Sequence, residues 1–272
     1  MIEENLQKEL REIYNPDGSE LRTLQLHLLD ILIEFDRICR KYGIDYWLEY
    51  GTLLGAARHG GFIPWDDDLD VSILKKDHNR LKKALQNELS SPFSFIDADS
   101  KEGYTRRWGR IMDSRITILR MVENPKKKGD LIERKEDIWL DIFYVVNGKT
   151  SLSKKVERFY GRCFRRKHKH IEDGTLKHII GVVLFPLAQL TVVFARAFGK
   201  IFYPKCLIND FGTGFHGQRF VNDIFPTTDI QFEHHFFKAP HNYDHYLQLY
   251  FDNWETIPDN KKDHDIKEII VN

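Results

Sequence analysis

The chain has 272 residues, which is long enough for one large hydrophobic core or for a core with an insertion. Its 41 basic and 41 acidic residues cancel, so it lacks the positive field of nucleic-acid-binding proteins and we expect no nucleic-acid partner. Three widely spaced cysteines without a CxxC pair predict reduced thiols in the cytoplasm and argue against a zinc site. The charged first residues lack an apolar segment, so no secretory signal is expected.

An amphipathic helix over residues 21–42 is the first predicted element. Apolar residues recur there at steps of three and four with charged residues between them, which is typical of a helix with one buried face. Gly43 predicts the end of this helix. We expect the helix to pack against the core and to take no part in chemistry.

A short strand over residues 44–50 is predicted next, followed by a turn and a helix over residues 53–58. Gly51 permits a tight turn, and Thr52 can cap the helix. The free backbone N–H groups at a helix start bind phosphate, so Gly51 and Thr52 are candidate phosphate contacts. Glu49 ends the strand and is expected either to brace a nearby arginine or a substrate hydroxyl, or to face solvent.

Four aspartates, at positions 66, 67, 68 and 70, lead into an alternating apolar segment that predicts a strand ending at residue 74. In an extended chain Asp68 and Asp70 point to the same face. Neighbouring carboxylates repel, and burial would protonate them unless a cation neutralises them. Mg²⁺ or Mn²⁺ prefers such oxygen ligands, so Asp68 and Asp70 predict a metal site, joined by Asp66 if the strand begins early. The alternative is an acidic surface turn.

A second informative segment, residues 138–146, is almost wholly apolar and predicts a central buried strand with Asp141 in its middle. A buried carboxylate needs a cation or hydrogen-bond donors, so we take Asp141 as the third metal ligand. The alternative is an ion pair with an arginine such as Arg110. Arg106 and Arg110 share a face of the strand predicted around residues 105–113, where guanidinium groups suit a phosphate donor. Arginines on a surface edge strand are the alternative there.

The segment Y-G-T-L-L-G-A-A-R-H-G-G-F-I-P-W-D-D-D-L-D resembles the signature of the LicD family, bacterial enzymes that transfer phosphocholine or related phospho-alcohols onto cell-surface glycans. A looser match covers residues 104–146, and residues 222–264 resemble the family's tail, with His234 and Phe251 replacing family glycines. The resemblance implies an α/β (α+β) fold, a nucleotidyltransferase-like mixed β-sheet flanked by helices. It also implies that the Gly-Thr turn and the Asp-x-Asp strand build a divalent-metal site.

A shift in composition after residue 150 predicts a helical insertion. We expect a catalytic core over residues 1–150, the insertion over residues 151–208, and a segment over residues 209–272 that completes the core and the substrate site. The insertion is strongly basic and then free of charge from residue 179 to 195. Such a helix either packs on the core or lies in a membrane interface. We expect a cytoplasmic protein that touches the inner leaflet of the plasma membrane, since acceptors in resembling pathways are often lipid-linked.

The family implies a CDP-alcohol donor, with CDP-choline favoured, and a hydroxyl acceptor on a glycan, a lipid-linked glycan or a teichoic acid precursor. Divalent ions would assist an in-line displacement. The candidate metal ligands are Asp66, Asp68, Asp70 and Asp141, of which the last three are also the candidate catalytic residues. The candidate substrate contacts are Gly51, Thr52, Glu49, Arg58, Trp65 and Arg110. The alternatives are a nucleotidyltransferase that moves NMP from an NTP to a small hydroxyl compound, and a non-catalytic membrane-associated regulator.

Overall fold

The computed structural model describes residues 2–98, 100, 104, 106–123, 129–168, 176–258 and 266–272. The helices are α1 (Glu4–Tyr14), α2 (Glu20–Tyr42), α3 (Tyr50–His59), α4 (His78–Glu88), α5 (Thr150–His168), α6 (Leu176–Phe202), α7 (Val221–Ile224) and α8 (Tyr243–Gln248), with a 3-10 turn, η1 (Lys75–Asp77). The strands are β1 (Tyr46–Leu48), β2 (Leu69–Leu74), β3 (Phe93–Ile96), β4 (Gly109–Glu123), β5 (Leu131–Asn147), β6 (Cys206–Asn209), β7 (Gln218–Phe220), β8 (Thr228–Phe232), β9 (His235–Ala239) and β10 (Ile266–Val271).

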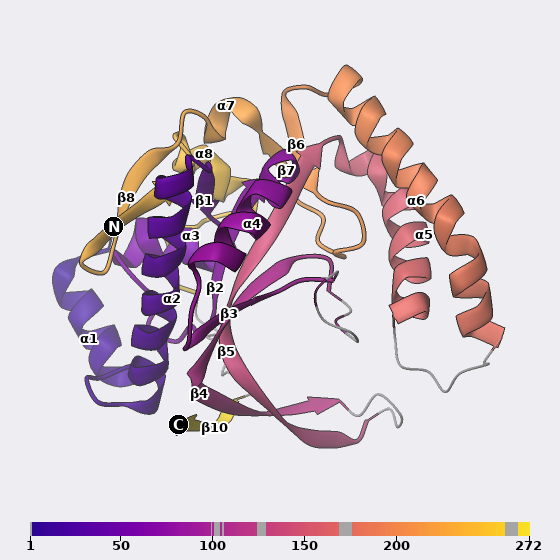
Figure 1. The fold of residues 1–272 in the computed structure, drawn as a ribbon. Helices are drawn as coiled ribbons and strands as arrows, with labels where there is room; N and C mark the ends of the chain where they lie inside the picture. The colour runs from indigo at the N-terminus through magenta and orange to yellow at the C-terminus, as the bar shows by residue number, and fades with distance from the viewer. Residues whose placement is uncertain are drawn as a thin grey trace.

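A mixed sheet with helices on its flanks organises the fold (Figure 1), which confirms the predicted fold class. Among the described residues it has eight strands, with the path β1-β2-β5-β4-β10, while β3 pairs with β4 and β6 joins β5 to β7. The pair β2 and β5 is parallel, and β4 pairs antiparallel with β5. The apolar segment predicted as a central strand is therefore confirmed, since β5 lies between β2 and β4 in the sheet.

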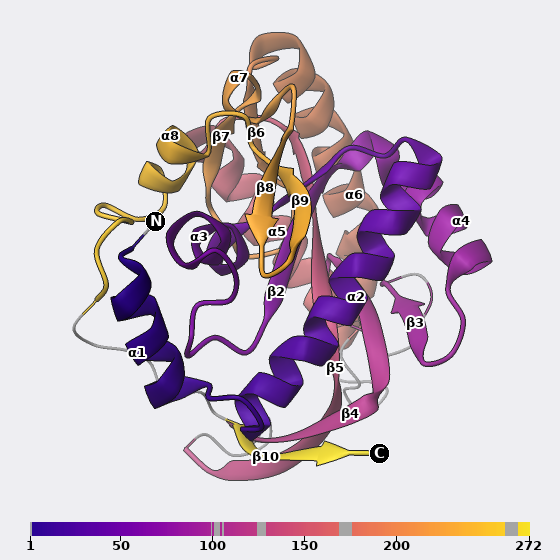
Figure 2. The same cartoon turned by 90° about the vertical axis from the view of Figure 1, so that its left-hand side faces the viewer.

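The long helix α2 confirms the amphipathic pattern and both of its ends are capped. Ser19 accepts a hydrogen bond from the Arg22 N–H at 3.2 Å, and Gly43 adopts a left-handed conformation with φ of 61°. Figure 2 shows α2 lying diagonally across one side of the sheet with α4 beside it. Its buried face is mainly apolar, as the spacing predicted, and also includes Arg22 and Gln25.

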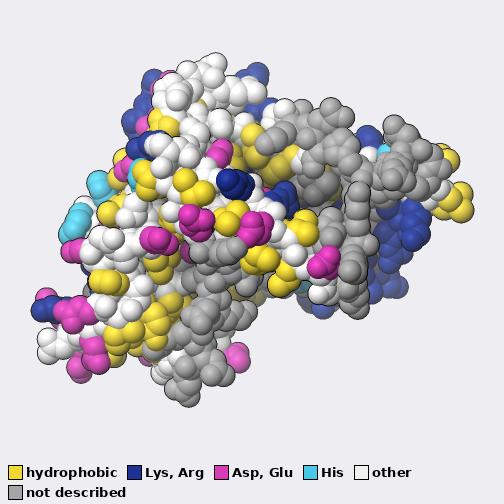
Figure 3. All heavy atoms as spheres, turned by 90° about the horizontal axis from the view of Figure 1, so that it is seen from below, with side chains coloured by type: hydrophobic (Ala, Val, Ile, Leu, Met, Phe, Trp, Pro, Cys, Tyr) yellow, Lys and Arg dark blue, Asp and Glu magenta, His cyan; other side chains and the backbone are white. Residues whose placement is uncertain are grey.

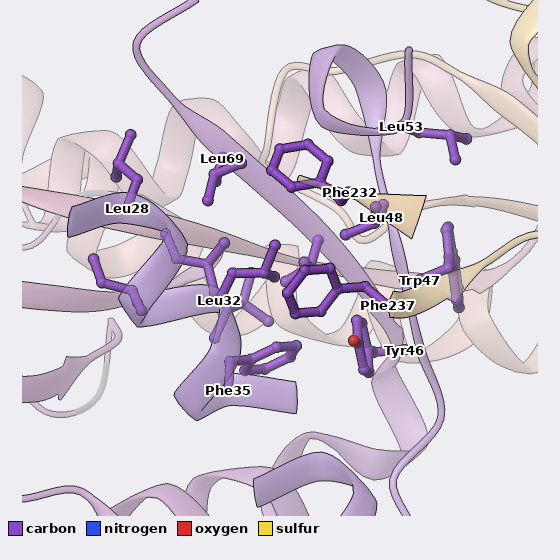
Figure 4. Packing of buried hydrophobic residues seen from close by; sticks show 14 of the residues in the cluster. Leu28, Leu32, Phe35, Tyr46, Trp47, Leu48, Leu53, Leu69, Phe232 and Phe237 are labelled. Atoms are coloured by element: carbon purple, nitrogen blue, oxygen red, sulfur yellow. The ribbon is translucent and has the colours of Figure 1, made fainter. Parts of the chain in front are cut away.

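The core between α2 and the sheet also takes residues from the C-terminal third of the chain. In the close-up of Figure 4, Leu32 and Phe35 of α2 lie near Tyr46 of β1, and Phe232 and Phe237 enter from the separate hairpin of β8 and β9. All five side chains are fully buried or nearly so. The C-terminal segment thus contributes to the same core as the N-terminal half.

The helices α5 and α6 pack against each other to one side of the sheet (Figure 1). Phe185, Ala188 and Val192 of α6 are buried in this contact. Near the end of α6, a Cβ at Gly199 would lie against the Asn147 carbonyl of β5, so glycine allows the helix to approach the sheet closely. We call this pair of helices the α5–α6 hairpin.

The α5–α6 hairpin carries both basic and exposed apolar side chains. Seen from below in Figure 3, Lys and Arg side chains gather at the end of the molecule that carries the hairpin, with hydrophobic side chains at its tip. In the described part of the chain, α6 is the one helix long and apolar enough to cross a membrane by length and composition. Of an 18-residue apolar stretch within this helix, 22% is buried. The helix therefore exposes far more apolar surface than a core helix does.

Candidate active site

Three adjacent strands place Asp70, Asp141 and Arg110 side by side. Asp70 of β2 is the register partner of Asp141 in the parallel pair with β5. Asp141 is in turn the register partner of Arg110 in the antiparallel pair with β4. Residues directly opposite on neighbouring strands project to the same face of a sheet, so the three side chains form one row across it.

Donors from β4, β5 and the residue before β4 hold the Asp141 carboxylate. Arg110 Nε and Trp108 Nε1 both lie 2.7 Å from Asp141 Oδ1, and Trp139 Nε1 lies 3.1 Å from Oδ2. The Arg110 guanidinium also lies over the Trp139 ring, 3.8 Å from its centroid. Charge-assisted bonds of this kind fix the orientation of a partly buried carboxylate. The predicted pairing with Arg110 is thus observed, and the metal-ligand role of Asp141 stays a prediction.

The remaining carboxylates repel one another strongly. Burial raises the pKa of Asp70 well above its usual value, and the charges of Asp68, Asp141, Asp66 and Glu49 raise it further. Burial also raises the pKa of Asp66, as do Asp68 and Asp67, while Arg58 opposes the shift. A cation beside these oxygens would reverse both effects.

The segment that bears the aspartates is shorter than predicted. Strand β2 begins at Leu69, so Asp66 and Asp68 lie before it and Asp68 is exposed. Asp67 is buried in an ion pair with Arg120, with 2.6 Å between Oδ2 and Nη2. Only Asp70 therefore extends from the strand itself, and Asp66 and Asp68 approach it from the preceding loop.

This arrangement predicts an unusual pH dependence for the protein in chelator. A raised carboxyl pKa means that the folded state binds more protons than the unfolded chain above about pH 4, so the free energy of unfolding falls as pH rises. Asp70→Asn removes this penalty. We expect the variant to melt at a higher temperature than the wild type at pH 8 in EDTA, with the difference closing near pH 4.

Thermal melts followed by circular dichroism would measure this difference, with Asp45→Asn as control because Asp45 is an exposed carboxylate outside the row of Asp70, Asp141 and Arg110. A variant at position 70 that is less stable than wild type at every pH would contradict the account of like-charge repulsion.

The start of α3 differs from the prediction. The helix begins at Tyr50 rather than at residue 53, and its N-cap is Glu49, so the expectation that Thr52 caps it is wrong. Tyr50, not Gly51, has the positive φ, 43°. Thr52 lies within the helix, where its Oγ1 accepts a hydrogen bond of 2.8 Å from the Asp70 N–H. Thr52 thus ties α3 directly to the strand that bears Asp70.

Gly51 has a packing reason in this structure. A Cβ at position 51 would lie 2.9 Å from Asp66 Oδ2, which is closer than real Cβ atoms come. Only glycine leaves room there for the carboxylate against the first turn of α3. The glycine therefore lets the Asp66 carboxylate lie against the start of the helix.

Glu49 is fully buried, so the expectation that it faces solvent is wrong, and the arginine that it pairs with is Arg219 rather than Arg58. Its contact with a substrate hydroxyl stays a prediction. Its carboxylate accepts hydrogen bonds from Trp47 Nε1 at 3.1 Å and from the Tyr246 hydroxyl at 2.8 Å. Arg219, also fully buried, lies 3.3 Å away through Nε. A buried carboxylate of this kind needs a cation, and here β7 supplies it.

Arg58 and Trp65 pack inside the protein. Arg58 donates to the carbonyl oxygens of Trp254 and Thr256 at 3.0 and 2.8 Å, and burial lowers its pKa to about 10 while Asp66 opposes the shift. Trp65 meets the ring of His59 edge-on, with centroids 5.9 Å apart. Their roles as substrate contacts remain predictions. The observed contacts of Arg58 link α3 to the C-terminal segment.

The sequence analysis missed an aromatic cluster beside the carboxylate row, which we define as Tyr50, Trp108, Phe143 and Phe215. Phe215 lies within 5.3 to 6.0 Å, between ring centroids, of the other three. Trp108 bonds to Asp141, which places the cluster at the row itself. The four residues are far apart in the sequence, since Tyr50 begins α3, Trp108 precedes β4, Phe143 lies in β5 and Phe215 lies in the loop before β7.

The donor set is chemically suited to a hard divalent cation. Carboxylate oxygens, which Mg²⁺ and Mn²⁺ prefer as ligands, come from Asp66, Asp68 and Asp70. A bound cation would relieve the repulsion between these carboxylates. Within the described ranges no group of three or more His, Cys, Asp or Glu side chains is arranged to hold a metal ion. Mg²⁺ in proteins is often held by one or two carboxylates, with water and substrate phosphates as the other ligands, so the metal-ligand roles of these aspartates stay predictions.

Comparisons with known proteins identify one matching family and several relatives. Residues 43–170 match the family described as LicD/FKTN/FKRP, nucleotidyltransferase domain. The chain is 28% identical over 275 residues to the lipopolysaccharide cholinephosphotransferase LicD of Haemophilus influenzae, covering 92% of this chain and 98% of that protein.

Two eukaryotic proteins match over shorter stretches. The human ribitol 5-phosphate transferase FKRP is 63% identical over 35 residues, 13% of this chain and 7% of that protein. The mannosyltransferase regulator 4 of Saccharomyces cerevisiae is 26% identical over 145 residues, 53% of this chain and 12% of that protein. The family match and the near full-length bacterial relative show that residues 43–170 of this chain carry a LicD-family nucleotidyltransferase domain.

Proposed function

We propose that the protein is a phosphotransferase that moves phosphocholine from CDP-choline to a hydroxyl of a cell-surface glycan or teichoic acid precursor. Two relatives support the class, since one is named a cholinephosphotransferase and another a ribitol 5-phosphate transferase. The single observation that carries the proposal is the row of Asp70, Asp141 and Arg110 on three adjacent strands. It combines oxygen donors for a cation with a guanidinium for phosphate.

In this proposal Asp66, Asp68, Asp70 and Asp141 would hold Mg²⁺ or Mn²⁺. When bound, the ion neutralises the donor's phosphates and the charge of the departing group. Gly51 and Thr52 lie in the first turn of α3, where backbone N–H groups have no partner within the helix and can bind the donor phosphate. Arg110 offsets the remaining negative charge beside Asp141.

The reaction forms a bond between the acceptor oxygen and the phosphorus that bears choline, and breaks the bond from that phosphorus to CMP. One of the carboxylates accepts the proton of the attacking hydroxyl. CMP leaves with the bonding electron pair. A nucleotidyltransferase with the same carboxylates would instead attack the alpha phosphate of an NTP and release pyrophosphate.

Product analysis separates these two reactions. The purified protein would be incubated with Mg²⁺ or Mn²⁺, a glycan acceptor and either CDP-choline or ATP, and the products followed by ³¹P NMR. We expect CMP and a new phosphodiester signal from CDP-choline. Release of pyrophosphate from ATP, with CDP-choline unchanged, would favour the nucleotidyltransferase. If neither donor gave a product, a non-catalytic regulator would be favoured, the role that the yeast relative's name describes.

The aromatic cluster supports choline as the transferred alcohol. A quaternary ammonium is attracted to the faces of aromatic rings, and Phe215 is 44% exposed beside Tyr50, Trp108 and Phe143. A ribitol chain would gain nothing comparable from these rings. The cluster thus favours a cationic alcohol next to the carboxylate row.

Phe215→Ala is expected to raise KM for CDP-choline by roughly 2- to 30-fold, since such contacts contribute about 0.5 to 2 kcal/mol. KM for CDP-ribitol, if it is turned over, should not change. Phe220→Ala is the matched control, because Phe220 is also exposed but stacks on His245 away from the cluster. Equal effects on both donors, measured by steady-state CMP release, would remove the cluster from donor selection.

We also propose that the protein works at the cytoplasmic face of the plasma membrane through the α5–α6 hairpin. The exposed apolar side chains of α6 and the basic side chains of α5 support an interfacial contact with anionic lipids. Co-sedimentation with phosphatidylglycerol vesicles should exceed that with phosphatidylcholine vesicles. Val183→Asp, on the exposed face of α6, should reduce it, and unchanged sedimentation would contradict this contact.

A further inference from the structure

A cavity of about 450 Å³ lies where the α5–α6 hairpin meets the sheet. Its wall is formed by α5, α6, β6 and the segment after it, with Val156, Thr191, Phe194, Phe198, Ile208 and Phe211 among the lining residues. The volume falls within the range of natural small-molecule sites. None of the residues of the carboxylate row lines the cavity, and the proposed chemistry does not use it.

The wall of this cavity offers hydrocarbon rather than hydrogen bonds. The Thr191 hydroxyl donates to the Ala188 carbonyl at 2.8 Å, and the Ser153 hydroxyl donates to the Lys149 carbonyl at 3.1 Å. Both hydroxyl hydrogens are thus used within their own helices. Cavities with apolar walls favour apolar ligands over water.

The cavity is continuous with the exposed apolar face of α6. Phe194 and Phe198 line it and are 65% and 47% exposed, and Val183 and Leu187 continue the same helix with exposures of 69% and 53%. A chain that leaves a bilayer on which α6 lies can therefore enter without crossing polar surface. Lys149 also lines the cavity and is exposed, which places a positive charge at the rim.

We infer that this cavity binds the alkyl chain of an anionic membrane lipid, with Lys149 beside the lipid phosphate. The apolar wall selects the chain, and the ammonium group selects an anionic headgroup over a neutral one. The lipid site rests on the proposed membrane contact of α6 but not on transferase activity, because no residue of the carboxylate row lines the cavity. A second copy of the chain could cover the same face, and the test distinguishes that case.

The test is isothermal titration of the full chain with decyl phosphate below its micelle concentration, compared with decyl maltoside and inorganic phosphate. Ala195→Phe places a ring in the cavity, because Ala195 lines it. Val193→Phe is the matched control, since Val193 is 58% exposed on the same helix and does not line the cavity. We expect decyl phosphate to bind at least tenfold more weakly to A195F than to wild type, with V193F unchanged and inorganic phosphate not bound.

Lys149→Glu tests the headgroup independently, on an exposed side chain whose change leaves the fold intact. It should weaken decyl phosphate several-fold and leave decyl maltoside unaffected. Equal binding of decyl phosphate to wild type and A195F would overturn the inference. A second result would also overturn it: the wild type binds no amphiphile, and light scattering shows that it is a dimer which Ala195→Phe converts to a monomer.

Discussion

Asp70→Asn is expected to lower the rate of phosphocholine transfer on the order of a thousandfold. Asp70 lies at the centre of the carboxylate row, opposite Asp141 and next to the Thr52 hydroxyl. An amide binds a divalent cation far less strongly than a carboxylate, and metal stabilisation of a transferring phosphoryl group contributes several kcal/mol, or about tenfold in rate for each 1.4 kcal/mol.

The rate would be measured as CMP release from CDP-choline at saturating Mg²⁺ or Mn²⁺. Circular dichroism should show an unchanged fold, and the melting temperature in EDTA at pH 8 should rise, as like-charge repulsion predicts. Asp45→Asn should retain full activity because Asp45 is an exposed residue just before β1. A fully active variant at position 70 would remove Asp70 from the metal site.

Arg219→Met is expected to destabilise the fold by about 3 to 5 kcal/mol, because it leaves the buried Glu49 carboxylate without its cation. Arg219 also donates to the hydroxyls of Tyr246 and Tyr50, at 2.8 and 3.0 Å, so the change breaks a whole buried network. Urea unfolding followed by tryptophan fluorescence would measure the loss.

Two further variants distinguish this explanation from simple loss of packing. Arg37→Met removes an arginine from ion pairs with Glu34 and Glu88 on the exposed side of α2, so its melting temperature should hardly change. Adding Glu49→Gln to Arg219→Met should recover part of the lost stability, since it removes the uncompensated charge. If the double variant is no more stable than Arg219→Met alone, the buried carboxylate is not the cause.

Periodicity and local composition were enough to predict the elements that position the site. The alternating Val71 and Ile73 predicted β2, and the apolar segment around Asp141 predicted the central strand β5. Gly43 marked the end of α2 because its left-handed conformation is a local property of the chain. Each of these depends on neighbours in sequence, so each could be read from it.

Long-range partners could not be predicted in the same way. Arg219 lies 170 residues after Glu49 in sequence, and no local pattern marks either as a member of a buried pair. Helix α3 begins at Tyr50 rather than at residue 53. Tertiary contacts hold Tyr50 at a positive φ, which a tyrosine does not prefer locally. Phe215 joins the site only through its packing on Trp108 and Phe143.

The division into a core, an insertion and a completing segment remains a prediction. The buried side chains of the proposed parts form two separate clusters. Phe232 and Phe237 share a core with α2, so the C-terminal segment is bound to the N-terminal half by its packing. The buried residues of the α5–α6 hairpin form a separate cluster around Phe164 and Phe185. An insertion at this point would leave the carboxylate row intact, because β5 ends at Asn147, before α5 begins.

The central claim is a metal-dependent site for a CDP-alcohol, and a thermal-shift titration tests it most directly. Wild type and Asp70→Asn would be titrated with CDP-choline, CDP-glycerol, CDP-ribitol and ATP, each with and without Mg²⁺ or Mn²⁺. Ligand at a hundredfold excess over its dissociation constant stabilises by about 2.7 kcal/mol. We predict a rise in melting temperature of wild type with CDP-choline that requires the metal and is lost in Asp70→Asn. A rise with ATP alone, or one that persists in Asp70→Asn without metal, would contradict the account.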